Sequence, residues 1–169
     1  MRSSHRIVLS GAKSLAICAV LLAAVVLPAA KLAAQDVTLP LKTIEAKHFT
    51  QAEGLGLSQE FIDQFYEGLR TELPKTKLAE QVVEEGGTVA DADAANSVVV
   101  EGKLLSKKSG FVGIVRAEIN LYRRSDHSLI KTITPEIPYK PSPLNTDKTI
   151  GHSTGRRAAY EIMRALKTK

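Results

Sequence analysis

The sequence predicts a two-layer α+β domain, with a mainly antiparallel sheet of about five strands and two helices on one face. Three observations lead to this fold class. Apolar side chains recur at helical spacing near residue 65 and again near residue 160. Between these stripes lie short runs rich in β-branched residues, separated by turn residues. Within residues 115–122, apolar and polar side chains alternate, which is typical of a half-buried antiparallel strand.

The domain is expected to open with a strand at residues 43–50 and a helix at residues 61–73. A Gly-Leu-Gly segment breaks the chain between them, Ser58 is a good N-cap, and Pro74 ends the helix. The apolar stripe of this helix consists of Phe61, Ile62, Phe65, Tyr66, Leu69 and Leu73. Its spacing predicts a helix that buries one face.

Four further strands are expected after this helix, at residues 78–83, 98–105, 115–122 and 129–137. The run 98–105 is the strongest because it is rich in valine and leucine. Residues 84–96 are acidic and alanine-rich and contain a Gly-Gly pair, so they are expected to form a loop.

A proline-rich crossing and a closing helix complete the domain. Four prolines between residues 135 and 143 are expected to stop the sheet and stiffen the segment that crosses to the helix. The helix is predicted at residues 153–167, with Ser153 or Thr154 as its cap. Its buried face consists of Ala158, Ala159, Ile162, Met163 and Leu166.

Residues 1–34 have the pattern of a secretory signal peptide. A basic start is followed by residues 14–30, which carry no charge, and by small residues near a cleavage point. The best cleavage point lies between Ala34 and Gln35. The alternative is an uncleaved N-terminal helix that anchors the chain in a membrane. In either case the rest of the chain is expected to be exported, to the periplasm or out of the cell.

The remaining residues, 35–169, are expected to form one exported domain with its core within residues 43–167. Cys18 is the only cysteine and lies in the leader, so the domain has no disulfide, thiol nucleophile or cysteine metal site.

The formal net charge of +5 also belongs mostly to the leader. Without residues 1–34 the chain has 19 basic and 18 acidic side chains. The basic doublets at 107–108 and 123–124 are expected at opposite ends of a hairpin, so they form no single basic patch with interleaved aromatic residues, and nucleic-acid binding is not expected.

Residues 151–155 match the G-x-S-x-G motif of serine hydrolases. The context excludes that chemistry. The motif should follow a buried strand, whereas residues 141–149 are polar and rich in proline. The acid and histidine partners should come later, but the 14 residues after Gly155 contain no Asp and no His. No catalytic residues are therefore predicted, and the chain is not expected to be an enzyme.

Other ligand motifs are incomplete. His48, His127 and His152 lie on different elements, and no pair has the spacing of a helical zinc site. Residues 91–96 begin like a calcium loop but lack its third oxygen position and its glycine. The Gly-Leu-Gly segment lacks the third glycine and the lysine of a phosphate loop. No cofactor and no metal site are predicted.

The closing helix offers a candidate contact surface. Arg156, Arg157 and Arg164 make it basic, and contact with anionic lipid head groups at the membrane periphery is one use of such a surface. The alternative is that these arginines form ion pairs with acidic residues of the same helix, since Arg157 and Glu161 have the i, i+4 spacing of an ion pair.

The order of elements resembles a family of exported bacterial proteins built on a domain of unknown function. The most suggestive segment is residues 94–102, an alanine-rich stretch leading into a strand that ends in Glu101-Gly102. The strand ending in Phe49-Thr50, the helix 61–73, the hairpin 117–133 and the helix 158–166 complete a resemblance over most of residues 43–167. The shape is similar to the small domains of the TolB amino-terminal region and the curli-secretion lipoprotein. Asn96 replaces the family's aspartate, and a glycine-rich insertion is reduced to residues 107–110.

This resemblance implies no catalytic residues, because the family has none established. The sequence therefore predicts a non-enzymatic domain of the cell envelope that binds another envelope protein or a second copy of itself, through an exposed sheet edge. The alternative is a periplasmic domain that binds a small ligand or a lipid, which requires an apolar cavity between sheet and helices.

Overall fold

The computed structural model describes residues 37–144 and 146–168. The leader, with the cleavage point predicted between Ala34 and Gln35, lies outside the described residues. The elements are the strands β1 (Leu41–Ala46), β2 (Thr50–Gln51), β3 (Ala79–Glu84), β4 (Ser97–Lys108), β5 (Gly113–Arg123), β6 (Leu129–Ile133) and β7 (Glu136–Tyr139). The helices are α1 (Gln59–Glu72) and α2 (Asp147–Lys167), and η1 (Leu73–Thr76) and η2 (Asp91–Asn96) are short 3-10 helices.

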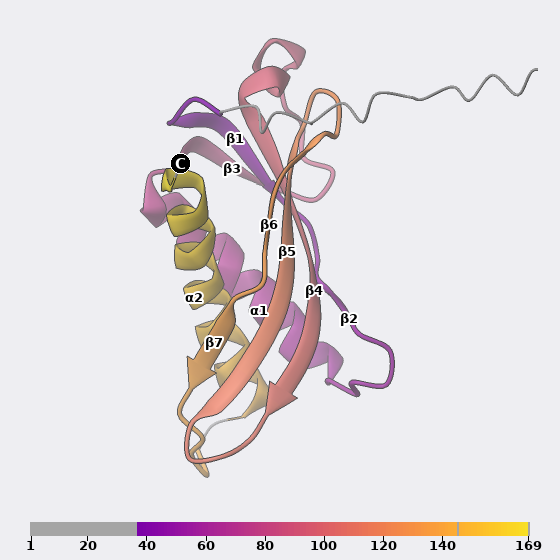
Figure 1. The fold of residues 1–169 in the computed structure, drawn as a ribbon, viewed down its shortest axis with the longest axis vertical. Coiled ribbons are helices and arrows are strands. Elements are labelled where there is room, and N and C mark those ends of the chain that lie inside the picture. Colours follow the sequence, from indigo (N-terminus) through magenta and orange to yellow (C-terminus); the bar gives the residue numbers. More distant parts are fainter. Residues whose placement is uncertain (1–36, 145, 169) are drawn as a thin grey trace, which may run out of the picture. The chain divides into compact units, whose positions relative to one another are not determined.

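The strands form one mixed sheet in the order β3-β1-β4-β5-β6, with β2 paired to β4 and β7 paired to β5. The long strands β4 and β5 are antiparallel, as are β6 and β7 against β5. β1 runs parallel to β3, to which the chain returns through α1, and it is also parallel to β4. Most of the paired residues are antiparallel, which confirms the predicted α+β class (Figure 1).

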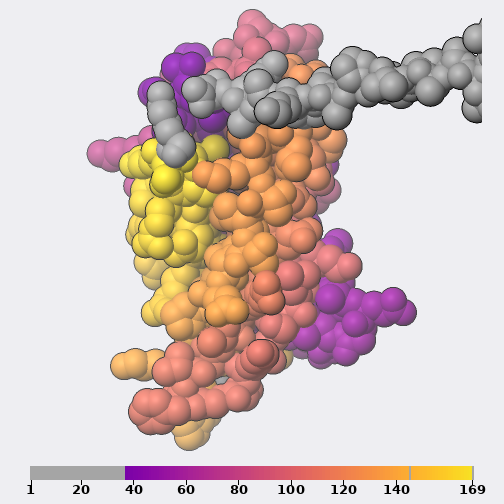
Figure 2. Space-filling view, in the orientation of Figure 1, coloured from indigo at the N-terminus to yellow at the C-terminus, as the bar shows by residue number. Residues whose placement is uncertain are grey.

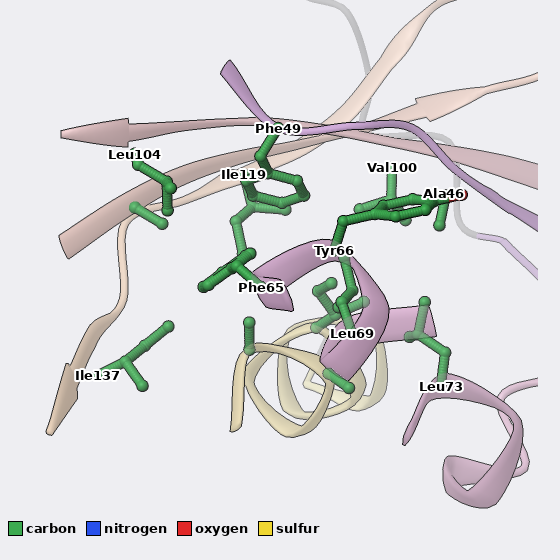
Figure 3. Close-up of a cluster of buried hydrophobic side chains, with 14 of the residues drawn as sticks. Ala46, Phe49, Phe65, Tyr66, Leu69, Leu73, Val100, Leu104, Ile119 and Ile137 are labelled. Carbon is green, nitrogen blue, oxygen red and sulfur yellow. The ribbon is translucent and has the colours of Figure 1, made fainter. Parts of the chain in front are cut away.

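Both helices cover one face of the sheet, as predicted, and the core lies between the two layers. Figure 3 shows Val100 and Ile119 of the sheet, and Phe49 from the segment between β1 and β2, in one cluster with Phe65 and Leu69 of α1. Ser58 caps α1 as expected, because its hydroxyl accepts a hydrogen bond from the backbone N–H of Phe61.

The alternating pattern of β5 is confirmed by burial. The buried face of this strand consists of Val115, Ala117, Ile119 and Leu121. In the β4–β5 hairpin, Val98 pairs with Arg123 and Lys108 pairs with Ile114. The two basic doublets therefore lie at opposite ends of the hairpin, as predicted, and form no single patch.

The strand predicted at residues 129–137 is two strands, β6 and β7, which pair with successive parts of β5. Pro135 lies in the break between them, and its carbonyl accepts from the N–H of Ala117 at 3.2 Å. The prediction that the prolines from residue 135 stop the sheet is wrong at Pro138, which lies within β7 and pairs with Ile114. Proline is tolerated there because β7 lies at the edge of the sheet.

The closing helix begins earlier than the predicted residue 153. Thr146 caps α2, and its hydroxyl accepts from the N–H of Thr149. Thr154 lies inside the helix, where its hydroxyl donates to the carbonyl of Ile150 at 2.7 Å. The prediction failed because, apart from Ile150, the residues of the first turns of α2 are polar or glycine, so the apolar periodicity starts late.

Glycines bring the two helices into close contact. A Cβ atom built on Gly155 of α2 would lie 1.9 Å from the carbonyl oxygen of Phe65, and one on Gly151 would lie 2.5 Å from that of Phe61. On α1, a Cβ atom at Gly68 would lie 2.1 Å from the carbonyl oxygen of His152. The motif that resembles a hydrolase elbow is thus a helix-packing motif, in which missing side chains let two backbones touch.

Candidate protein-binding edge

The three arginines predicted as surface contacts have partners within the chain. The guanidinium of Arg156 donates to Glu72 at 2.8 Å, Arg157 donates to the carbonyl of Pro138, and Arg164 donates to Glu161 at 3.0 Å. Arg157 and Arg164 lie beside β7 and β6, whereas Arg156 reaches back to α1. The structure therefore does not gather the three into one patch.

Glu72 is a buried carboxylate that joins the two helices. Its side chain is 2% exposed. It accepts from Arg156, from the hydroxyl of Tyr160 at 2.7 Å and from Lys75 at 3.0 Å. These donors, Arg156 first, lower the pKa of Glu72 to about 2. No local pattern predicted this cluster, because Arg156 and Tyr160 are more than 80 positions away from Glu72.

The outer edge of β6 presents unpaired backbone groups. In an antiparallel ladder, every second residue directs its N–H and C=O groups toward the neighbouring strand. Since the Pro135 carbonyl bonds to β5, Ile133 and Lys131 in the same register also face β5. Thr132 and Thr134 then direct their backbone groups away from the sheet. Among residues 37–144 and 146–168, these outward groups have no backbone partner.

The side chain of Thr132 supports this alternation. Thr132 lies opposite Asn120, and its hydroxyl donates to the Asn120 side-chain oxygen at 2.7 Å. Side chains approach most closely at pairs that exchange no backbone hydrogen bonds. The backbone of Thr132 is therefore free of β5 and available to a further strand.

A groove runs beside this edge, between β6 and the end of α2. Its volume is about 330 Å³, and a second hollow of about 190 Å³ continues it beside β7. The groove is lined by Lys131, Ile133, Thr134, Pro135, Glu161, Arg164, Ala165 and Thr168. A strand added to β6 would direct alternate side chains into this groove, where apolar and charged groups both lie within reach.

Lys131 is a charged residue on the inner face of the edge strand. It pairs with Leu121, whose side chain is fully buried. Its ammonium group donates to the carbonyls of Ala165 at 2.8 Å and Thr168 at 3.3 Å, at the end of α2. A cation at a helix C-terminus is favourable because it meets carbonyls that have no partner within the helix. An inward charge on an edge strand also disfavours indiscriminate strand pairing.

The opposite edge of the sheet, β3, carries ion pairs. Glu84 binds Arg70 of α1 at 2.8 Å, and Glu80 binds Lys42 of β1 at 2.8 Å. Charged side chains along a strand disfavour pairing with another strand. β6 carries one such charge, Lys131, which is bound to the end of α2, and a groove lies beside it, so β6 is a better candidate for binding than β3.

A polar hollow of about 200 Å³ lies where β1 and β3 end. Its lining includes Lys47, which binds Glu101 at 2.6 Å, and His48, which stacks on Tyr66 and contacts Glu85 at 3.2 Å. The backbone N–H of His48 lowers the pKa of Glu85. Opposite charges are matched within this hollow. No group of three or more His, Cys, Asp or Glu side chains in the described part of the chain could hold a metal ion.

The helices within residues 37–144 and 146–168 include none with the length and apolar character that a membrane span requires. The chain matches no family model. It matches no curated protein either.

Solved structures do resemble the fold. An uncharacterised protein has a TM-score of 0.53 at 11% identity, with 77% of this chain and 96% of that chain covered. The PelC dodecamer from Paraburkholderia phytofirmans has a TM-score of 0.48 at 9% identity, covering 72% of this chain and 87% of that one. TolB from Acinetobacter baumannii has a TM-score of 0.32 at 15% identity, covering 73% of this chain and 28% of TolB. The first similarity shows a shared fold and agrees with the expected likeness to domains of unknown function. The likeness to TolB and to the curli-secretion lipoprotein stays a prediction.

Proposed function

We propose that this chain is a non-enzymatic, exported domain of the cell envelope that binds another protein, or a second copy of itself, along the β6 edge. The observation that carries the proposal is the row of outward backbone groups at Thr132 and Thr134, beside a groove lined by α2. A partner strand would complete these hydrogen bonds and place alternate side chains in the groove. The leader supports export, and the absence of a complete catalytic motif from the sequence supports a binding role.

Two features of the edge support a selective partner. Lys131 faces the groove side and is held by the end of α2, so a partner strand must leave that contact intact or offer an oxygen acceptor in its place. Glu161 and Arg164 line the groove and bind each other at 3.0 Å. A partner side chain with either charge therefore finds a complement there.

Thr132→Pro is expected to abolish binding at this edge while leaving the fold intact. Proline removes the outward N–H of residue 132, which β5 does not use, so the sheet keeps its hydrogen bonds. Thr132→Val is the matched control, because it removes the hydroxyl and retains the N–H. The measurement is photo-crosslinking in the expressing cell from a photoreactive residue at position 134, with thermal unfolding of each variant as the test of folding.

The proposal requires a cross-linked product of defined mass that Thr132→Val retains and Thr132→Pro loses. A product formed equally well from a photoreactive residue at Gln81 on β3 would contradict the assignment to β6. Light scattering of the purified chain over a dilution series separates the two kinds of partner. A stable oligomer that Thr132→Pro dissociates identifies a second copy, and a monomer in both variants identifies a different protein.

A further inference from the structure

Large apolar side chains project into solvent from two loops of the domain. In the turn between β4 and β5, Phe111 is fully exposed and Val112 is half-exposed. In the loop between β7 and α2, Leu144 is almost fully exposed. Single exposed apolar residues are ordinary, but three such side chains on neighbouring loops indicate a binding site.

The two loops lie at the same end of the domain. Gly113, at the end of the first turn, pairs with Tyr139, at the start of the second loop. The hydroxyl of Tyr139 donates to the carbonyl of Lys108 at 3.2 Å. At the far end of the second loop, Asp147 binds Lys107 at 2.6 Å. Figure 2 shows the end of the hairpin at the bottom of the view, with part of the β7–α2 loop beside it.

Packing holds this end of the molecule in place. A Cβ atom at Gly113 would lie 2.1 Å from the ring of Tyr139, so the ring rests directly on the backbone of the hairpin. The apolar side chains therefore project from a rigid end of the domain. This end, formed by the β4–β5 turn and the β7–α2 loop, is called the tip below. Ordering such a tip on binding costs less conformational entropy than ordering a free loop.

The surroundings of the tip are basic. Residues 102–117 and 137–146 contain no Asp and no Glu. Lys108, Lys140 and Lys148 are exposed there. Asp147, at the start of α2, is matched by Lys107. The tip thus has two kinds of side chain. Its apolar side chains can be buried away from water, and its lysines attract a negatively charged surface.

We propose that this tip binds the surface of a membrane containing anionic phospholipids, with Phe111, Val112 and Leu144 inserted among the head groups and acyl chains and the lysines meeting the phosphates. Buried apolar area and attraction to anionic lipid together determine the strength of such binding. The lysines favour a lipid surface over an apolar pocket in a protein. This proposal is independent of the β6 edge. It differs from the lipid contact expected for Arg156, Arg157 and Arg164, which have partners within the chain.

The chain contains no tryptophan, so one introduced tryptophan reports on one place. With Phe111→Trp in the full chain, tryptophan emission is expected to shift to the blue when vesicles of phosphatidylcholine with phosphatidylglycerol are added. Vesicles of phosphatidylcholine alone should produce a much smaller shift. Leu129→Trp is the matched control, because Leu129 is also an exposed apolar residue but lies on β6, where it pairs with Tyr122 at the other end of β5. This local readout is preferred to sedimentation because residues 14–30 could themselves hold the chain on a vesicle.

A second set of variants measures what each part of the tip contributes, with Val112→Trp as the reporter. Adding Phe111→Ser and Leu144→Ser should raise the lipid concentration at half-maximal shift about tenfold or more, because two large apolar side chains are lost. Adding Lys108→Glu, or raising the salt concentration, should also weaken binding. Each of these residues is exposed, so the fold should survive.

Three results would overturn the proposal. In the first, Phe111→Trp gives no shift with either kind of vesicle. In the second, Leu129→Trp shifts as much as Phe111→Trp, which would place the contact elsewhere on the chain. In the third, Phe111→Trp shifts only with an envelope protein extract free of lipid, which would make the tip a protein-binding site.

Discussion

Gly155→Ala is expected to lower the free energy of unfolding by about 2–3 kcal/mol, although alanine is the better helix former. Helix propensity alone would favour alanine by about 1 kcal/mol. The expected loss has the opposite sign because the new Cβ atom would lie 1.9 Å from the carbonyl oxygen of Phe65. Backbone cannot rotate aside as a side chain can, so α1 and α2 must separate and loosen the core between them.

Urea unfolding monitored by circular dichroism measures this difference. Gly110→Ala is the control, since a Cβ atom at Gly110 meets its nearest neighbour at 3.5 Å, an ordinary contact. That variant should unfold close to the wild type. A Gly155→Ala variant as stable as the wild type would show that the helices do not touch at this glycine.

Glu72→Gln is expected to lower the free energy of unfolding by about 2 kcal/mol near neutral pH. The wild-type carboxylate is buried and ionised, and its pKa is lowered from 4.5 to about 2, first by Arg156 and then by Tyr160 and Lys75. A lowered pKa means that this carboxylate stabilises the folded chain at pH values above 4.5. The contribution is lost progressively as the pH falls from 4.5 toward 2.

The difference in stability between the wild type and Glu72→Gln should therefore shrink over that interval, measured by urea unfolding at a series of pH values. Glu80→Gln is the matched control, because Glu80 also binds a lysine but is exposed, and exposed pairs contribute little. Its effect should be below about 0.5 kcal/mol. A difference for Glu72→Gln that does not change with pH would show that the carboxylate acts through packing rather than through its charge.

Local patterns in the sequence predicted the elements whose own residues determine them. The alternation around Ile119 predicted β5, and the stripe through Phe65, with Ser58 as its cap, predicted α1. The start of α2 was missed because its first turns pack through Gly151 and Gly155, which carry no apolar side chain for a periodicity to detect. The break between β6 and β7 was missed because apolar residues continue on both sides of Pro135.

The sequence predicted that a sheet edge binds a partner, but not which strand forms that edge. A binding edge follows from the fold class, but the identity of the edge strand depends on the strand order, which no local pattern encodes. Nothing in the sequence distinguishes Thr132 and Thr134. Only the register with β5 shows which way their backbone groups point. Arg156 and Arg157 were predicted as surface contacts because their partners, Glu72 and the carbonyl of Pro138, lie far away in the sequence, whereas Glu161, the partner of Arg164, is three positions away.

The position of β1 between β3 and β4 has a consequence for the order of folding. β1 is synthesised first but pairs with β3 and β4. Thr43 therefore cannot pair with Ser97 until β4 has been synthesised. The β4–β5 hairpin, in contrast, joins Lys108 to Ile114 across a short turn and can form as soon as it is made. Contacts between residues far apart in sequence form slowly because a long loop must close first. The N-terminal strand should therefore join the sheet late, after β4 has formed.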